Sequence, residues 1–230
     1  MDDIVANIQK MYDEIGSHFS RTRQKTYGEG ESTNWIVTDK YLKLLKSGES
    51  VLDIGCGNGK LVTGLPEGVS YLGTDFSQTL LGEARRLHPH HEFRFGDVID
   101  PAYWASLGTY DALFCVAVLH HIPERSQQLF VLGEMKKHLE PGGFLYLSVW
   151  NLWQKKYLQY HVDGHVEVPY VQSTEKGKEE WIRYCVPYTI ESLSDLLREA
   201  GWVIDETYYA NRDGEPANIE SSQNLVAVAK

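Results

Sequence analysis

The apolar positions of this chain follow two spacings, and their order along the sequence predicts an α/β fold. Apolar residues recur at helical spacing over residues 3–19, and a second helix is expected over 35–46. Short apolar runs rich in β-branched residues then predict buried strands at 50–54, 69–75, 91–95, 110–116 and 144–150. Because helical and strand segments alternate, we expect a doubly wound sheet with helices on both faces.

The second half of the chain predicts two further helices, each with a recognisable boundary. The first is expected from about Pro123 to Leu139, before Pro141-Gly142-Gly143. The second is expected after Thr189, whose hydroxyl suits a helix N-cap, and closes at Gly201. Two last strands, at 202–209 and 225–229, bring the predicted sheet to seven.

The turn after the first predicted strand, Asp53-Ile54-Gly55-Cys56-Gly57-Asn58-Gly59, carries the clearest chemistry. Glycines suit a tight turn because they adopt positive φ values and let a ligand approach the backbone. A phosphate-binding turn is the rival interpretation. The third glycine comes one residue too early for the dinucleotide pattern, and Gly59-Lys60 is followed by Leu61 rather than Ser or Thr. Asp53 at the strand end favours a ligand that carries a cation or an amine.

Two later strands also end in acids. Asp75 closes the second strand, where a carboxylate accepts hydrogen bonds from both hydroxyls of a ribose. Gly96-Asp97 closes the third, where it can bond the exocyclic amine of an adenine. Because NAD-binding folds use the same ribose contact, Asp75 does not decide between cofactors.

Taken in order, these motifs resemble those of the class I S-adenosylmethionine-dependent methyltransferases over roughly residues 45–150, including the loop Leu119-His120-His121. The resemblance implies a Rossmann-like methyltransferase fold, with a mostly parallel seven-stranded sheet whose last strand is antiparallel. It also implies S-adenosyl-L-methionine as cofactor. The cofactor-binding residues that it implies are Asp53, Gly55, Cys56, Gly57, Gly59, Asp75, Phe76, Gly96, Asp97, Val98, Cys115 and Val116.

A narrower resemblance extends into the N-terminal helix. The segment from Tyr12 to Arg23 carries the pattern Y-x-E-I-x-x-H-F-x-x-T-R and is similar to the opening of the tRNA wobble-uridine carboxymethyl methyltransferases, including the domain fused to an AlkB-like dioxygenase. Val168-Pro169-Tyr170 and Arg183-Tyr184 are similar to later motifs of that family. The resemblance implies methylation of the carboxylate of 5-carboxymethyluridine in the tRNA anticodon loop. It further implies a small zinc-binding activator subunit, if the chain is eukaryote-like.

That reaction needs few catalytic side chains, because a carboxylate is already ionised at neutral pH and attacks a methyl sulfonium without a general base. The protein must position the acceptor and exclude water. We expect two arginines to grip the acceptor and two histidines to orient it: Arg23, Arg183, His120 and His121. Tyr12, Phe19 and Arg23 are also expected near the methionine end of the cofactor. No metal site is expected, since the cluster His88, His90 and His91 suits a loop.

The resemblance divides the chain into four segments of one domain. Residues 1–46 supply N-terminal helices and a lid, and 47–150 form the cofactor-binding core. Residues 151–188 are polar, aromatic and irregular, and are expected as an insertion over the substrate side. Residues 189–230 supply the C-terminal helix and the last two strands.

Composition restricts the partners. The formal net charge is −10, and residues 1–46 hold seven acids and seven bases, so the acidic excess lies downstream. A general attraction to nucleic acid is therefore not expected, and RNA would need a local basic patch. The three cysteines form no close pair, Asp2 and Asp3 do not suit a signal peptide, and no membrane span is evident. We expect a cytoplasmic enzyme.

Three other functions stay open on the sequence. The first is methyl transfer to a small metabolite with a carboxylate, hydroxyl or amine acceptor. The second is a catalytically silent cofactor-binding subunit that serves a partner. The third is a NAD-dependent oxidoreductase, which the glycine spacing disfavours.

Overall fold

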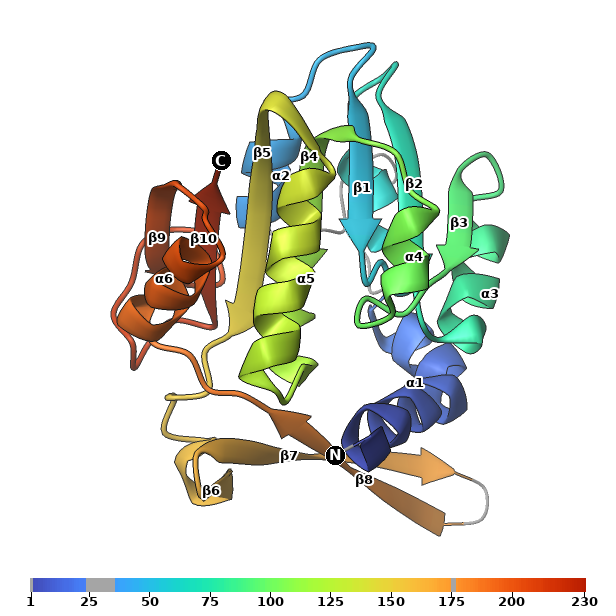
Figure 1. The fold of residues 1–230 in the computed structure, drawn as a ribbon. Helices are drawn as coiled ribbons and strands as arrows, with labels where there is room; N and C mark the ends of the chain where they lie inside the picture. The colour runs from blue at the N-terminus through green and yellow to red at the C-terminus, as the bar shows by residue number, and fades with distance from the viewer. Residues whose placement is uncertain (1, 24–35, 175–176) are drawn as a thin grey trace.

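A central seven-stranded sheet organises the chain (Figure 1). The computed structural model describes residues 2–23, 36–174 and 177–230. The strands are β1 (Ser50–Ile54), β2 (Ser70–Asp75), β3 (Glu92–Phe95), β4 (Tyr110–Val116), β5 (Leu139–Trp150), β9 (Ile204–Ala210) and β10 (Asn224–Ala229). Their order in space is β3-β2-β1-β4-β5-β10-β9. The first five are parallel, whereas β10 is antiparallel to both β5 and β9. The predicted doubly wound sheet, with its antiparallel last strand, is confirmed.

Helices cover both faces of this sheet. They are α1 (Asp2–Arg23), α2 (Ile36–Leu42), α3 (Gln78–Leu87), α4 (Pro101–Ala105), α5 (Arg125–Lys137) and α6 (Ile190–Glu199). Alternate residues of each strand serve opposite faces: in β4, Leu113 and Cys115 pack toward α4, α5 and α6, whereas Ala112 and Phe114 pack toward α2 and α3. Since both faces are covered, the central strands β1, β4 and β10 read as nearly continuous apolar runs.

Several boundaries differ from the sequence prediction. The glycine turn leads into a short 3₁₀ helix, η1 (Lys60–Gly64). Of the expected helix 35–46, only the seven residues of α2 are helical among the described ones, and position 35 lies outside the described residues. Strand β5 begins at Leu139, so Pro141-Gly142-Gly143 lies within a strand rather than after a helix. The predicted N-cap Thr189 is confirmed and forms a capping box with Ser192.

The insertion 151–188 is not irregular, and that prediction was wrong. It contains η3 (Leu158–Tyr160) and a three-stranded antiparallel sheet of β6 (His161–Val162), β7 (His165–Thr174) and β8 (Gly177–Cys185). Its strand pattern is hard to read from the sequence, because the hairpin also carries exposed apolar side chains such as Val171 and Ile182. The hairpin β7–β8 lies below the carboxyl ends of the parallel strands, next to α1 (Figure 1).

The two ends of the sheet therefore differ in what surrounds them. The carboxyl ends of the parallel strands face α1, the hairpin β7–β8 and the short 3₁₀ helix η2 (Leu119–His121). The antiparallel β10 runs the other way and ends at the opposite edge of the molecule. In open α/β sheets, ligands bind beyond the carboxyl ends of the strands. No helix among the described residues is long and apolar enough to cross a membrane.

Candidate active site

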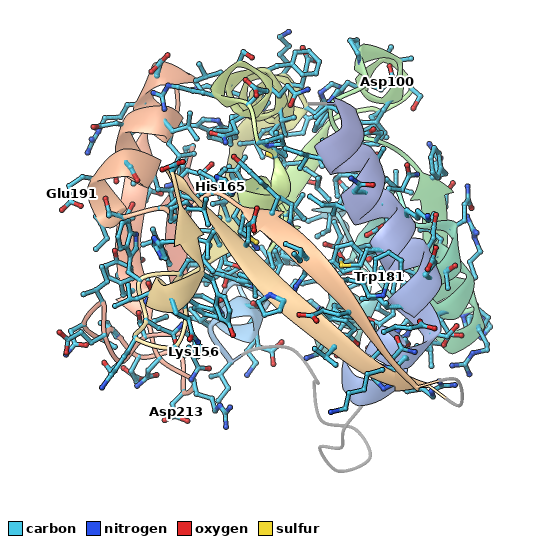
Figure 2. All side chains as sticks on the ribbon, turned by 90° about the horizontal axis from the view of Figure 1, so that it is seen from below. Asp100, Lys156, His165, Trp181, Glu191 and Asp213 are labelled. Atoms are coloured by element: carbon cyan, nitrogen blue, oxygen red, sulfur yellow. The ribbon has the colours of Figure 1, made fainter. Side chains whose placement is uncertain are left out.

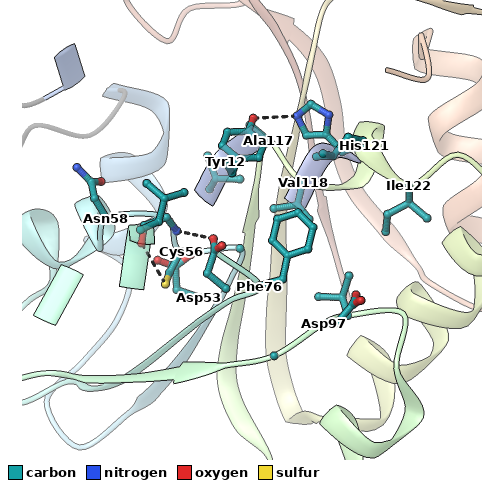
Figure 3. A pocket seen from close by; sticks show the side chains of 18 of the residues that line it. Tyr12, Asp53, Cys56, Asn58, Phe76, Asp97, Ala117, Val118, His121 and Ile122 are labelled. Carbon is teal, nitrogen blue, oxygen red and sulfur yellow. Dashed lines mark hydrogen bonds between the residues drawn. The ribbon is translucent and has the colours of Figure 1, made fainter. Parts of the chain in front are cut away.

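A cavity of about 330 Å³ opens at the carboxyl ends of β1, β2 and β4 (Figure 3). Many of the residues predicted to bind the cofactor lie around it: Tyr12, Phe19, Asp53, Gly55, Cys56, Gly57, Asp75, Phe76, Gly96, Asp97, Val98 and Val116. The predicted histidine His121 also lines it. Residues that the sequence did not single out complete the wall: Val5, Ile8, Thr38, Asn58, Lys60, Leu61, Leu80, Ile99, Ala117, Val118, Ile122 and Trp150.

The glycine turn forms one wall, and its backbone conformation explains the residue type. Gly55 and Gly57 have φ values of 70° and 56°. A Cβ on Gly55 would lie 2.2 Å from Cγ2 of Val118, whereas a Cβ on Gly57 would meet nothing within 4 Å. The first glycine therefore allows close packing, and the second leaves backbone open to a ligand.

Asp75 connects two parts of this wall. Its carboxylate accepts hydrogen bonds from the backbone N–H of Gly57 and of Ser77, both at 2.8 Å. Burial raises the pKa of Asp75 to about 6, against the lowering effect of these two bonds. Each carboxylate oxygen has acceptor capacity beyond one bond, so the group can still receive the hydroxyls of a ribose.

Asp53 lies at the floor of the cavity, 3% exposed. The hydroxyl of Tyr71 donates to it at 2.8 Å, and burial raises its pKa to about 7. An ionised carboxylate so poorly hydrated is stabilised by a cationic partner. The position therefore suits an ammonium group.

Gly96, Asp97 and Val98 form the far wall. A Cβ on Gly96 would lie 2.3 Å from the ring of Tyr103, so only glycine fits the path of the chain. The Asp97 carboxylate accepts from the backbone N–H of Ile99 at 3.1 Å, and burial raises the pKa of Asp97. This wall offers one acid and apolar surface, which is suited to a flat ring with an amine edge.

The opposite wall comes from α1 and η2. The hydroxyl of Tyr12 lies 3.3 Å from Nε2 of His121, and Nδ1 of His121 lies 3.2 Å from the carbonyl oxygen of Tyr184 (Figure 3). Because a carbonyl only accepts, Nδ1 carries the proton and Nε2 accepts from Tyr12. Burial lowers the pKa of His121 to about 4, so its ring is neutral at physiological pH. The ring of Phe19 packs edge-on against Tyr12, with centroids 5.5 Å apart.

Two of the predicted residues pack on Trp150 and do not line the cavity themselves. His120 is fully buried, with its ring centroid 4.3 Å from His121 and 4.8 Å from Trp150. Arg183, 8% exposed, places its guanidinium carbon 4.7 Å from the Trp150 ring and 5.3 Å from the Tyr170 ring. Its Nη2 donates to the Pro169 carbonyl at 3.3 Å, whereas its Nε has no hydrogen-bond partner among the described residues.

Two further predicted residues, Cys115 and Gly59, do not line the cavity, and the side chain of a third is not among those that the structure describes. Cys115 is fully buried in the core shared with α5, because neighbouring residues of a strand face opposite sides. Gly59, with φ 76°, packs against Phe93 and His88 instead. Arg23 ends α1, and its side chain lies outside what the structure describes. The proposed lid over residues 24–35 also lies outside the described residues.

Histidines outside the cavity have other surroundings. His88 and His91 pack with each other and with Phe93 and Tyr71 at the edge of the sheet. Among the described residues, the group with metal-ligand geometry is His120, His121 and Cys185, whose ligand atoms lie within 4.8 Å of one another. The nearby Arg183 charge opposes a bound cation. Burial is the main cause that lowers the pKa of both histidines, and the Arg183 charge lowers it further.

Known proteins resemble this chain along most of its length. A family model described as a methyltransferase domain matches residues 34–207. The tRNA (carboxymethyluridine(34)-5-O)-methyltransferase of Saccharomyces cerevisiae is 30% identical over 174 residues, covering 74% of this chain and 58% of that protein. The Arabidopsis thaliana enzyme of the same name is 29% identical over 175 residues, covering 76% and 38%. The chain thus spans less than two thirds of these relatives' length.

Solved structures share the fold. The CcbJ methyltransferase of Streptomyces caelestis has a TM-score of 0.71 at 17% identity, covering 95% of this chain and 96% of that one. The DhpI-SAM-HEP complex has a TM-score of 0.67 at 18% identity, covering 99% and 97%. A methyltransferase bound to the Haloferax volcanii Trm112 methyltransferase activator has a TM-score of 0.64 at 15% identity, covering 95% and 96%. With its domain match, sheet order and motifs in agreement, the chain belongs to the S-adenosylmethionine-dependent methyltransferases.

Proposed function

We propose that this chain methylates the carboxylate of a 5-carboxymethyluridine in the anticodon loop of tRNA, giving a methyl ester. Two relatives named for that reaction support the proposal, as does the N-terminal motif from Tyr12 to Arg23. The acceptor side of the cavity supplies the physical argument.

The observation that carries the proposal is the Arg183 guanidinium behind Trp150. It is nearly buried, stacked between two aromatic rings, and forms no salt bridge with a carboxylate among the described residues. A buried charge without a counterion is costly, so an anionic ligand at this position would be stabilised. Guanidinium groups match the planar, bidentate geometry of a carboxylate.

The other walls suit S-adenosylmethionine, residue by residue. We propose that Asp53 receives the methionine ammonium, Asp75 the ribose hydroxyls and Asp97 the adenine amine. The glycine turn would accept the methionine end, with Tyr12 and Phe19 closing over it. When bound, the cofactor supplies a methyl group on a sulfonium, which is an electrophile.

The remaining residues would orient the acceptor and keep water out. Because the acceptor carboxylate is ionised, no side chain has to remove a proton, and the neutral His121 agrees with that chemistry. The acceptor would be held with one carboxylate oxygen in line with the methyl group that the bound cofactor would supply. Arg183, whose guanidinium stacks on the cavity residue Trp150, would hold the second carboxylate oxygen, and the pair Tyr12 and His121 would orient the acceptor from the other side.

The test is methyl transfer to anticodon stem-loops of matched sequence. One carries 5-carboxymethyluridine at the wobble position, and the control carries unmodified uridine. We expect labelled methyl from S-adenosylmethionine on the modified stem-loop only. Mild alkali then releases the label, since an ester hydrolyses whereas an ether or N-methyl group does not.

Two other outcomes are informative. Transfer to free small carboxylic acids without transfer to RNA would contradict the tRNA proposal and support a metabolite methyltransferase. Alkali-stable label on RNA would contradict the carboxylate acceptor. The activator subunit stays a prediction, tested by repeating the assay with a small zinc-binding activator protein present. The cytoplasmic location also stays a prediction.

A further inference from the structure

Helix α1 is attached to the cofactor side of the site by two polar side chains, Gln9 and Asp13, neither of which is a fixed position of the Tyr12–Arg23 pattern. The amide of Gln9 donates to the backbone carbonyl of Phe76 at 2.8 Å. The carboxylate of Asp13 accepts from the hydroxyl of Ser77 at 2.7 Å and from the backbone N–H of Thr79 at 3.3 Å. Both residues therefore hold the segment that follows Asp75.

Ser77 links this contact directly to Asp75. Its backbone N–H donates to Asp75 at 2.8 Å, while its hydroxyl oxygen accepts from Leu80 at the start of α3. Asp13 thus adds a negative charge at the N-terminus of α3, where the helix dipole stabilises it. A continuous series of hydrogen bonds leads from α1 through Ser77 to Asp75 and on to Gly57.

The same helix also contacts the acceptor side. Tyr12 bonds His121, and Nδ1 of His18 lies 3.0 Å from the hydroxyl of Tyr170 on β7. The ring of Tyr170 in turn covers the guanidinium of Arg183. Figure 2 shows the hairpin β7–β8 from below with α1 beside it.

Packing fixes the position of α1 between these two sides. A Cβ on Gly16 would lie 2.9 Å from Cγ2 of Thr79, so the helix approaches α3 too closely for a side chain there. Met11 and Ile15, each 1% exposed, bury the apolar face. This close packing would oppose sliding of the cofactor segment along α1.

We propose that Asp13 and Gln9 are positioning residues that couple the cofactor segment to the acceptor hairpin through α1, so that cofactor occupancy tightens the acceptor side. The acceptor part of this inference rests on the proposed function, whereas the coupling does not. Linkage requires that an acceptor tightens the cofactor by the same factor.

The test measures hydrogen exchange and needs no acceptor. S-adenosylhomocysteine is added to the full chain, and backbone amide exchange is followed in α1 and in β7. We expect the ligand to slow exchange in both, although none of the described β7 side chains lines the cavity. In Asp13→Asn the protection of β7 should be lost, and the dissociation constant should rise about fivefold for one weakened hydrogen bond to a charged group.

Glu14→Gln is the matched control, because it removes the same charge from the next residue. Glu14 is exposed, and its carboxylate lies 3.9 Å from the ammonium nitrogen of Lys10. We expect wild-type affinity and wild-type protection of β7 for this variant. Gln9→Ala serves as a second variant if Asp13→Asn does not fold, and it should also lose the protection of β7.

The outcomes separate this inference from the proposed function. The coupling would be overturned if the ligand protected only the cavity loops of the wild-type chain. It would also be overturned if β7 protection were retained in both Asp13→Asn and Gln9→Ala. Either result would leave the acceptor proposal intact. Failure of S-adenosylhomocysteine to bind in calorimetry would overturn both. Normal coupling without methyl transfer to the modified stem-loop would remove only the tRNA acceptor.

Discussion

The cofactor side and the acceptor side of this cavity are built in different ways. On the cofactor side, Asp53, the glycine turn and Asp75 lie within one strand–turn–strand segment, and backbone groups form much of the surface. On the acceptor side, Tyr12, His121, Trp150 and Arg183 come from four separate elements that meet only in the folded chain.

This difference predicts how each side responds to change. The cofactor side depends on local backbone geometry, as at Gly55, where any side chain would collide with Val118. The acceptor side depends on packing between distant elements, so its side chains can vary while the scaffold remains. Variants that affect one side and spare the other test this division.

The largest effect is expected at Arg183. Arg183→Ala should lower kcat/KM for the modified stem-loop roughly 100-fold, because an anionic acceptor loses its charged partner. Affinity for S-adenosylhomocysteine, measured by calorimetry, should stay within about twofold, since Arg183 does not line the cavity. Arg183→Lys should recover part of the activity. Equal losses in cofactor affinity and turnover would place Arg183 on the cofactor side.

Asp75→Asn should affect cofactor binding rather than the acceptor side. The amide keeps the shape but loses the charge that accepts from Gly57, Ser77 and the ribose, so cofactor affinity should fall about 30-fold. Calorimetry with S-adenosylhomocysteine measures this, and Asp100→Asn at an exposed position is the control. An unchanged dissociation constant would contradict the ribose assignment.

Over the physiological pH range, the change in cofactor affinity with pH should be smaller than the effects of Arg183→Ala and Asp75→Asn. Burial raises the pKa of Asp53 to about 7, so below that pH the free protein holds this group protonated. Affinity for the cationic amine should fall by up to about tenfold per pH unit as pH drops below 7. Asp53→Asn should bind weakly at every pH and flatten this part of the profile.

Stability without cofactor should change in the opposite direction. Because the folded pKa of Asp53 lies above its unfolded value, the folded state binds more protons between these two values. The free energy of unfolding should therefore decrease as pH rises toward 7, and denaturant titrations of the wild type against Asp53→Asn measure this term. If the Asp53 contribution to the free energy of unfolding instead increased as pH rose over this range, the carboxyl would not be buried and poorly solvated.

The smallest effect is expected at Tyr12. Tyr12→Phe keeps the ring and removes the hydroxyl 3.3 Å from His121, so kcat/KM for the acceptor should fall only about threefold. Cofactor affinity should be unchanged within error. A loss comparable to that of Arg183→Ala would show that the Tyr12–His121 pair does more than orient the acceptor.

Most residues that the sequence assigns to the cofactor line the cavity, because their signals are local. Three glycines and two acids are arranged by one turn and two neighbouring strands, and their spacing is visible without knowing the fold. The error at Cys115 has a physical reason within the same strand. Cys115 and Val116 alternate in direction, so only one of them reaches the cavity.

The acceptor side was predicted only through resemblance, and its detail was not accessible. Trp150 reads as the last residue of a buried strand, and nothing in its spacing indicates that Arg183, on a hairpin 33 residues later, would stack on it. Gln9 and Asp13 read as the polar face of an amphipathic helix, although both bond to the segment after Asp75. Such contacts depend on tertiary packing.

The reversed direction of β10 has a practical consequence. It delivers residue 230 to the edge of the sheet farthest from the hairpin, whereas α1 starts next to that hairpin (Figure 1). An affinity tag or a surface tether joined after residue 230 would leave the entrance clear for a molecule as bulky as a folded RNA. The same attachment before α1 would crowd that entrance, so immobilised assays should anchor the chain by its C-terminal end.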